Sequence, residues 1–251
     1  ILHNMAFSVK HRGPDGEACW INTSGNVGFA HRRLSVIDTS IAAAQPMHFA
    51  GRYTIVYNGE IYNYQELRAT LAGQGIIFNT SSDTEVILAM YHIYKKQCLG
   101  FFDGMFSFAI WDEREQLLFC ARDRFGEKPF YYHHSSAAFY FGSEIKVLKA
   151  AGIYTSINHS LLLQFIANGR TSDGTDPGKT FSNTICKLPA AHFLTYDYRE
   201  NSISVTRYWE INKNACPEGS EKAIIEQFSE LFFTSVRRRL RSDVSVGTSL
   251  S

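Results

Sequence analysis

The order of strand-like and helix-like segments is the feature of this sequence that most constrains its fold. Runs rich in β-branched and aromatic residues predict three single strands, at 17–22, 27–31 and 53–57. Two further strand pairs are predicted, 105–112 with 116–122 and 129–133 with 138–142. Helical spacing predicts a first helix that ends after Arg12, a second after Asn63 and a third from Ser82. Such blocks, rather than strict alternation, favour an α+β sandwich over a doubly wound parallel sheet.

Local signals set the expected ends of these elements. The Gly13-Pro14 pair breaks the first helix, and Gly73 with Gly75 stops the second. Ser82 is the expected N-cap of the third helix, with Glu85 completing a capping box. We therefore expect the third helix to bury one apolar face formed by Val86, Ile87, Met90 and Ile93.

A change of composition after Trp209 predicts a domain boundary. Residues 212–219 are polar and are interrupted by Pro and Gly, as a linker is, and an amphipathic helix follows them. Residues 243–251 are then expected to form a strand. The predicted organisation is one large domain at 1–210, a linker at 211–218 and the beginning of a second domain at 219–251. A chain of 251 residues with 45% hydrophobic content can bury a core of that size.

Composition narrows the classes of partner. The chain has 25 Lys and Arg against 24 Asp and Glu, so no charge excess points to nucleic acid or to an anionic membrane. Its five cysteines form no C-x-x-C pair and predict reduced thiols of a cytoplasmic protein, without a disulfide framework or zinc site. His133 and His134 are adjacent on a predicted strand and face opposite ways, so no metal site is expected. No apolar run approaches the roughly 20 residues that span a bilayer.

Arg33 ends a predicted strand and is a candidate for binding a carboxylate. A guanidinium grips a carboxylate with two parallel charged hydrogen bonds, which fixes orientation as well as charge. A surface ion pair is the simpler interpretation of an isolated arginine. Arg32 is the adjacent alternative, and alternation places the two side chains on opposite faces, so only one can reach a given pocket.

Asn58 and Gly59 follow the apolar run 53–57 and are candidates for an oxyanion hole. An Asn side-chain amide and a neighbouring backbone N–H can converge on the oxygen of a tetrahedral intermediate. Asn-Gly between two strands is also the strongest short signal for a hairpin. The residues that follow lead into a helical pattern rather than a long returning strand, which argues against the hairpin.

Asp83 lies in the first turn of its predicted helix and is a candidate for binding an ammonium group, with Glu60 beside it. Carboxylates in a first turn are ordinarily explained by capping and by the helix dipole. Because Ser82 already serves as the cap, Asp83 is left free for a ligand. Together, Arg33, Asn58 with Gly59, and Asp83 offer the groups needed to hold a zwitterionic amino acid and to stabilise an oxyanion on its side-chain amide.

These motifs, with His11-Arg-Gly-Pro-Asp15 upstream and the segment from Asp123 to Tyr132 downstream, resemble the glutaminase domain of glutamine-dependent asparagine synthetases. That family consists of class II, N-terminal nucleophile amidotransferases. The resemblance implies a four-layer α/β/β/α sandwich built on two antiparallel sheets, followed by the first helix and strand of an ATP-pyrophosphatase domain. It also implies the roles of the residues that bind glutamine, which are Arg33 for the carboxylate, Val36 and Ile37 through their backbone, Asn58 and Gly59 for the oxyanion, and Glu60 and Asp83 for the ammonium.

The resemblance further implies chemistry that begins upstream of Ile1. In the family, a cysteine at the mature N-terminus attacks the glutamine amide and its own α-amine acts as the base. The intact protein is therefore expected to begin Met-Cys-Gly, and this chain, without that cysteine, is expected not to hydrolyse glutamine. ATP and Mg²⁺ are expected to bind mostly beyond Ser251, with Leu250 contacting the nucleotide. Glutamine, aspartate and ATP are the implied substrates, and the resemblance allows a homodimer.

Two alternatives remain open at this point. An amidotransferase of the same family could deliver ammonia to another carboxylate or to a sugar, because the acceptor site is expected beyond Ser251. A catalytically inactive module that binds glutamine is the alternative from a different functional class.

Overall fold

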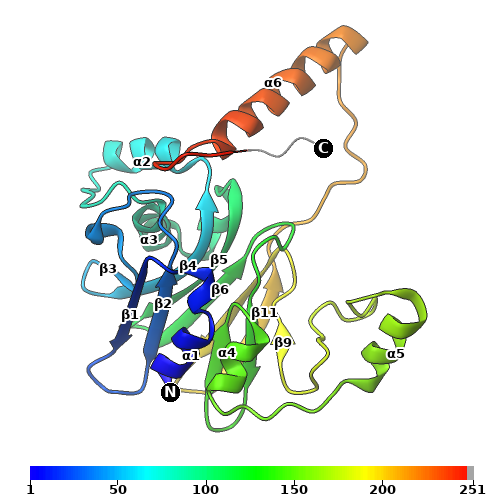
Figure 1. The fold of residues 1–251 in the computed structure, drawn as a ribbon. Helices are drawn as coiled ribbons and strands as arrows, with labels where there is room; N and C mark the ends of the chain where they lie inside the picture. Colours follow the sequence, from blue (N-terminus) through cyan, green and yellow to red (C-terminus); the bar gives the residue numbers. More distant parts are fainter. Residues whose placement is uncertain (248–251) are drawn as a thin grey trace.

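The computed structural model describes residues 1–247 and contains four layers, with helices outside and sheets inside (Figure 1). The central layer is a six-stranded sheet in the order β11-β10-β6-β5-β4-β3, in which each strand pairs antiparallel with its neighbours. Its strands are β3 (Met47–Phe49), β4 (Tyr53–Ile61), β5 (Gly104–Asp112), β6 (Leu117–Arg122), β10 (His192–Asp197) and β11 (Ser202–Arg207). The predicted α+β sandwich is confirmed.

One face of this sheet is covered by helices α2 (Tyr64–Gly73) and α3 (Asp83–Tyr94). Apolar side chains of α3 pack against aromatic side chains of β4, β5 and β6 to form the largest buried cluster. Val86, Ile87 and Met90 are buried there as predicted, whereas Ile93 is 38% exposed, because the helix ends one residue later. A short 3₁₀ helix, η3 (Lys95–Gly100), then leads to β5.

The other face of the large sheet packs against two smaller sheets rather than the single second sheet that was expected. One consists of β1 (Gly16–Ile21) and β2 (Gly28–Arg33), and the other of β7 (Tyr131–His134), β8 (Phe139–Gly142) and β9 (Cys186–Lys187). Phe29 of β2 and Phe141 of β8 touch edge to face, with ring centroids 5.6 Å apart, but no backbone ladder joins these strands. Backbone ladders hold each small sheet together, and side-chain packing joins the two sheets to each other.

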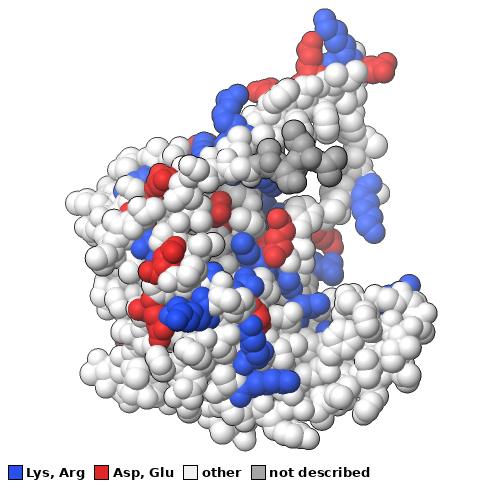
Figure 2. Space-filling model, in the orientation of Figure 1, with Lys and Arg blue, Asp and Glu red and all other residues white. Residues whose placement is uncertain are grey.

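The fourth layer contains α1 (Leu2–Ser8) and α4 (Ile145–Ala150), which share a small apolar cluster with Ile185. The 3₁₀ helices η1 (Lys10–Arg12) and η2 (Ile41–Ala43) flank the first two strands, and α5 (His159–Asn168) protrudes from the body beside β9 (Figure 1). Figure 2 shows Lys and Arg interspersed with Asp and Glu on the visible face, as expected from the near balance of charge.

The strand β4 runs straight through the Asn58-Gly59 pair, which settles the local alternative. Asn58 pairs with Ser107 and Gly59 with Phe106 in one uninterrupted ladder with β5. A Cβ on Gly59 would lie 2.1 Å from the Met105 carbonyl oxygen, so glycine is required by close backbone approach, not by a turn. The hairpin interpretation is wrong.

The N-terminus of α3 differs in one respect from the expected capping box. The Ser82 hydroxyl accepts a hydrogen bond from the Thr84 N–H at 3.1 Å, so Ser82 is the cap. The Glu85 carboxylate instead accepts bonds from the backbone N–H groups of Asn79 and Thr80. Glu85 thereby holds the loop before the helix, because its buried carboxylate finds more donors there than at Ser82.

Helix α6 (Glu221–Arg239) follows a segment without regular structure and extends away from the body (Figure 1). None of its residues is buried, so the apolar stripe predicted for this helix is exposed. The strand expected at 243–251 is absent over 243–247, and residues 248–251, including Leu250, lie outside the described residues. The backbone N–H of Asp243 bonds to Val36 rather than to a strand partner, so no ladder forms.

Candidate active site

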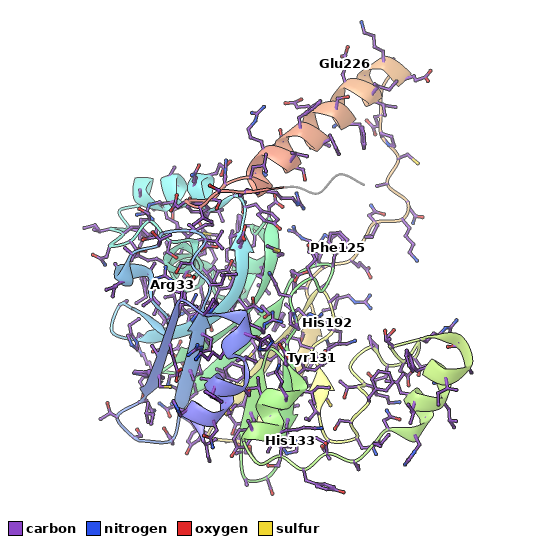
Figure 3. The ribbon with its side chains drawn as sticks, viewed as in Figure 1. Arg33, Phe125, Tyr131, His133, His192 and Glu226 are labelled. Carbon is purple, nitrogen blue, oxygen red and sulfur yellow. The ribbon has the colours of Figure 1, made fainter. Side chains whose placement is uncertain are left out.

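All the described residues predicted to bind glutamine line one cavity of about 1000 Å³ between the layers. Its apolar part is bounded by α1, β2 and β8, and its polar part by the ends of β2 and β4 and the start of α3. Figure 3 shows Arg33 at the end of β2 on the side of α3. The structure thus brings to one cavity wall the segments that carry Arg33, Val36, Ile37, Asn58, Gly59, Glu60 and Asp83.

The Asn58 side chain presents an amide donor that is buried and has no hydrogen-bond partner. A buried donor without a partner carries a desolvation cost of roughly 1–3 kcal/mol, so such groups are rare unless a ligand completes them. Asn58 is one of the residues that line the cavity, and its Nδ2 is the buried donor left without a partner. This is the arrangement that an oxyanion hole requires before its substrate binds.

Side chains from two other elements hold the peptide groups just before Asn58. The short strand β3 pairs with β4 only from Tyr53 to Ile55, so Tyr57 has no strand neighbour on that side. The Gln45 side-chain oxygen accepts from the Tyr57 N–H at 2.6 Å, and the ring of His31 donates to the Tyr57 carbonyl at 3.2 Å. Burial lowers the pKa of His31 to about 4, so the ring is neutral at pH 7 and can act as this donor.

The Asp83 carboxylate is buried and points toward β4. Its Oδ2 accepts from the Tyr57 hydroxyl at 2.8 Å and from the Ile61 N–H at 2.9 Å. Oδ1 has a weaker contact, at 3.5 Å, with the Ser82 hydroxyl. Burial raises the pKa of Asp83, although these hydrogen bonds oppose the rise. The first turn of α3 therefore offers a carboxylate that gains from a cation beside it.

Glu60 lies on the same cavity wall and has a raised pKa for two reasons. Partial burial contributes most, and the charge of Asp83 adds to it, while Lys128 acts in the opposite direction. A bound ammonium group would offset the repulsion that the charge of Asp83 exerts on ionised Glu60. This electrostatic arrangement matches the ammonium-binding role expected for Glu60 and Asp83.

Lys128 is a cavity residue that was not predicted as part of the site. The loop that carries it wraps around the fully buried Asp123, whose carboxylate accepts from the N–H groups of Phe125, Glu127 and Lys128. Asp123 also accepts from the Phe106 N–H, opposite Gly59 in the ladder. The downstream signature segment therefore tethers its loop to the strand beside the candidate oxyanion hole.

Arg32 and Arg33 both line the cavity, so the expectation that only one of them could reach it is wrong, but their partners differ. The Arg32 guanidinium is paired with Glu17, its cross-strand neighbour, and donates to the Gly13 carbonyl. The Arg33 guanidinium donates to the carbonyls of Asp38 and Ser40. Because a guanidinium carries five N–H donors, these two bonds orient Arg33 and leave donors for a carboxylate. Arg33 meets no carboxylate among the described residues.

Residues 34–40 form a loop that contains Val36, Ile37 and the unpredicted Asp38. Ile37 is buried in the large apolar cluster, and the Val36 carbonyl accepts from the Asp243 N–H at 3.0 Å. Asp38 has a φ of 50°, a left-handed conformation that is uncommon for residues other than glycine. Its carboxylate accepts local bonds from the N–H and hydroxyl of Ser40, while its own N–H bonds to the distant Asp243.

Nucleophile and metal candidates are few in the described part of the chain. Cys19 lines the cavity, but burial and the charge of Glu17 raise the pKa of its thiol, which opposes formation of a thiolate. Cys98 and Cys120 are buried, with thiol pKa values raised by burial. Residues 1–247 contain no group of His, Cys, Asp and Glu side chains placed to hold a metal ion. Within the same residues, no helix combines the length and apolar character needed to cross a membrane.

Comparison with known proteins shows similarity to glutamine amidotransferases. Residues 1–209 match the family described as a glutamine amidotransferase domain. The chain is 36% identical over 254 residues to the glutamine-hydrolyzing asparagine synthetase 3 of Bacillus subtilis (strain 168), covering 100% of this chain and 40% of that protein. It is 37% identical over 262 residues to asparagine synthetase 2 of the same organism, covering 100% of this chain and 34% of that protein.

The fold resembles that of the glutamine phosphoribosylpyrophosphate amidotransferase from B. subtilis, with a TM-score of 0.60 and 18% identity. The match covers 82% of this chain and 45% of that one. At this identity the likeness concerns the fold alone. The chain spans less than half the length of these relatives. It belongs to the glutamine amidotransferase domain family, and it is similar to part of the glutamine-hydrolyzing asparagine synthetases.

Proposed function

We propose that this chain is the glutamine-hydrolysing part of a glutamine-dependent asparagine synthetase. The observation that carries the proposal is the buried, unpartnered Asn58 amide in the same cavity as Arg33 and the Glu60–Asp83 pair. An amide donor, a fixed cation and two carboxylates complement the side-chain carbonyl, the carboxylate and the ammonium of glutamine. The similarity to asparagine synthetases supports the choice of acceptor.

In the proposed reaction, the thiolate of a cysteine preceding Ile1 attacks the side-chain carbonyl carbon of glutamine. The carbonyl oxygen becomes an oxyanion, which Asn58 Nδ2 and the Gly59 N–H stabilise. The α-amine of the same cysteine, which took up the thiol proton when the thiolate formed, gives that proton to the leaving nitrogen. The C–N bond then breaks, and ammonia departs from a γ-glutamyl thioester. Water hydrolyses the thioester to glutamate and frees the thiol. Arg33, Glu60 and Asp83 bind the α-carboxylate and α-ammonium throughout.

The proposed synthetase half amidates aspartate to asparagine, for which ATP with Mg²⁺ supplies the activation of the carboxylate. No described residue is assigned to binding ATP or Mg²⁺, since Leu250 lies outside residues 1–247. We further propose that residues 1–251 alone do not hydrolyse glutamine, because none of the described cysteine thiols combines a place in the cavity with a lowered pKa.

The full-length protein tests the proposal. Glutamate and ammonia should form from glutamine, and asparagine should form when aspartate, ATP and Mg²⁺ are added. Glutamine hydrolysis without asparagine formation would keep the amidotransferase and reject aspartate as the acceptor. Binding of glutamine without hydrolysis would indicate the inactive module.

A further inference from the structure

The segment after helix α6 is bonded to the loop at residues 34–40, although more than 200 residues separate them in the sequence. The Asp243 carboxylate accepts from the Asp38 N–H at 2.7 Å, across a separation of 205 residues. The Asp243 N–H donates in turn to the Val36 carbonyl at 3.0 Å. One residue thus contacts the backbone on both sides of Ile37, and these two bonds bracket the part of the loop predicted to contact glutamine.

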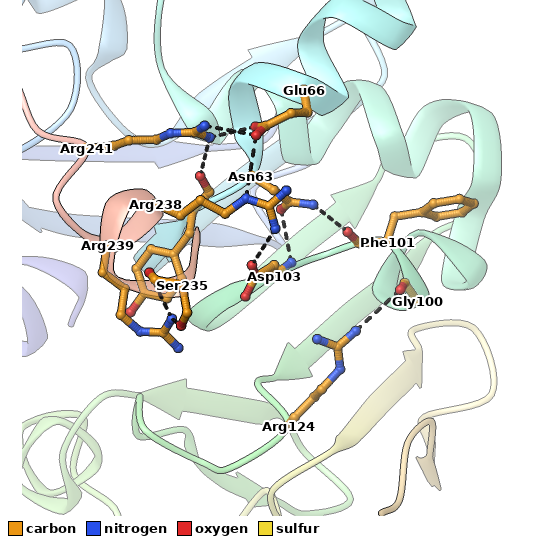
Figure 4. A network of polar contacts seen from close by, with 11 residues as sticks. Asn63, Glu66, Gly100, Phe101, Asp103, Arg124, Ser235, Arg238, Arg239 and Arg241 are labelled. Carbon is orange, nitrogen blue, oxygen red and sulfur yellow. Dashed lines mark hydrogen bonds and ion pairs between the residues drawn. The ribbon is translucent and has the colours of Figure 1, made fainter. Parts of the chain in front are cut away.

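Two arginines hold this segment in place (Figure 4). Arg241 forms a two-pronged pair with Glu66, at 2.6 and 2.8 Å, and donates to the Tyr62 carbonyl at 2.6 Å. Arg238 pairs with Asp103 at 3.0 Å. The bond from Arg241 lowers the pKa of Glu66 to about 2, so the carboxylate that Arg241 pairs with is ionised at neutral pH. The end of α6 is therefore anchored to α2 and to the loop before β5, beside the loop that it brackets.

Asp38 connects the two halves of the candidate amino-acid site. Its carbonyl accepts from the Arg33 guanidinium, and its carboxylate accepts from the Ser81 N–H at 2.7 Å. Arg33 is the predicted carboxylate-binding residue, and Ser81 lies two residues before Asp83, the predicted ammonium-binding residue. With its left-handed backbone, Asp38 depends on its neighbours to keep this conformation, and Asp243 supplies the bond to its N–H.

We infer that Asp243 is a positioning residue for glutamine binding, which acts by holding Asp38 and, through it, Arg33 and the start of α3. The inference rests on the proposed function. It makes the glutamine site sensitive to the placement of the region that follows α6. When the Asp243 contact is lost, Asp38 can leave its strained conformation, and the carboxylate-binding and ammonium-binding groups lose their fixed spacing.

The test compares Asp243→Ala with Asp243→Asn in the full-length protein. Alanine removes the acceptor for the Asp38 N–H, whereas the asparagine oxygen can replace it without the charge. Asp243→Ala should raise the KM for glutamine roughly five- to tenfold, the effect of about one ordinary hydrogen bond, and change kcat less than about twofold. Asp243→Asn should restore the KM to within about threefold of wild type. Synthesis with ammonia in place of glutamine should be unchanged in both, because it bypasses the glutamine site.

Other results would overturn the inference. An unchanged or lower KM in Asp243→Ala would show that the contact is neutral or inhibitory. Equal losses of kcat in both variants, with reduced ammonia-dependent synthesis, would show a general structural role. A wild-type protein that does not hydrolyse glutamine would refute the proposed function and this inference together. If the wild-type protein hydrolyses glutamine and the Asp243→Ala variant has the same KM for glutamine, the inference alone is refuted.

Discussion

The Tyr57 hydroxyl donates to the Asp83 carboxylate at 2.8 Å and so joins the middle of strand β4 to the first turn of helix α3. This bond lies one residue before Asn58, so the strand that carries the proposed oxyanion donor is tied directly to the helix that carries the proposed ammonium-binding carboxylate. The distance between these two proposed binding groups therefore depends on the sheet-to-helix contact, not on either element alone.

Replacing Asp83 should increase the stability of the protein and weaken its binding of glutamine. Because burial raises the pKa of Asp83, its ionised form is disfavoured in the folded protein. The cost of ionising Asp83 in the folded protein is absent below the pKa that Asp83 has in the unfolded chain. It grows as pH rises through the higher pKa that Asp83 has in the folded protein. Asp83→Asn should therefore increase the free energy of unfolding at pH 7 while raising the KM for glutamine roughly tenfold or more. Denaturant titration at pH 7 and initial-rate kinetics measure both; a variant that is less stable than wild type would contradict the burial argument.

Removing the Asn58 amide should affect the chemical step more than binding. Asn58→Ala should lower kcat about 100- to 1000-fold, the usual cost of one oxyanion-hole donor, with little change in the KM for glutamine. Because Nδ2 has no partner in the folded protein, the unfolding midpoint should not fall. Asn58→Asp keeps the shape but replaces the donor with a carboxylate, which repels the oxyanion, so it should lower kcat at least as much. A large rise in KM with normal kcat would place Asn58 in binding rather than catalysis.

The adjacent arginines offer a matched pair of substitutions. Arg33→Lys should raise the KM for glutamine roughly tenfold or more, because a lysine cannot reproduce two parallel bonds to a carboxylate. Arg32→Lys should leave that KM within about twofold of wild type, since Arg32 is engaged by Glu17 and Gly13. Steady-state kinetics on both variants decide the assignment, and an inverted result would move the carboxylate-binding role to Arg32.

Gly59 should tolerate no side chain. Gly59→Ala places a Cβ 2.1 Å from a backbone oxygen of β5, and the strands must separate to admit it. We expect a loss of more than about 3 kcal/mol in unfolding free energy. Gly51→Ala is the control, because nothing lies within 4 Å of its Cβ and only its left-handed backbone is strained, at a cost of about 1 kcal/mol. Thermal unfolding that ranks the two variants equally would contradict the close approach.

Glutamine binding should weaken on acidification. The pKa values of Glu60 and Asp83 are both raised, so these carboxylates take up protons above the ordinary carboxylate range near pH 4. Protonation removes the charges that face the ammonium group, so the KM for glutamine should rise as pH falls toward that range. The Glu60→Gln variant should shift this pH dependence by removing one of the two groups. A KM that is flat with pH in wild type would argue against both assignments.

Most elements could be predicted because their signals are local. Runs rich in β-branched and aromatic residues marked strands of each sheet, and Ser82 marked the start of α3. The capping box failed because Glu85 reached donors in its own preceding loop. The strand expected after Asp243 failed because a strand needs a neighbour, and here the backbone found a loop carbonyl instead.

For the candidate site too, some features could be predicted from the sequence and others only from the folded structure. The identities of Arg33, Asn58, Gly59 and Asp83, and their order along the chain, were legible in the sequence because each belongs to a short motif. Only the folded chain brought them to one cavity, left the Asn58 amide without a partner, and made Asp38 the link between distant segments. These properties depend on contacts between residues far apart in the sequence, and such contacts exist only when several layers pack together.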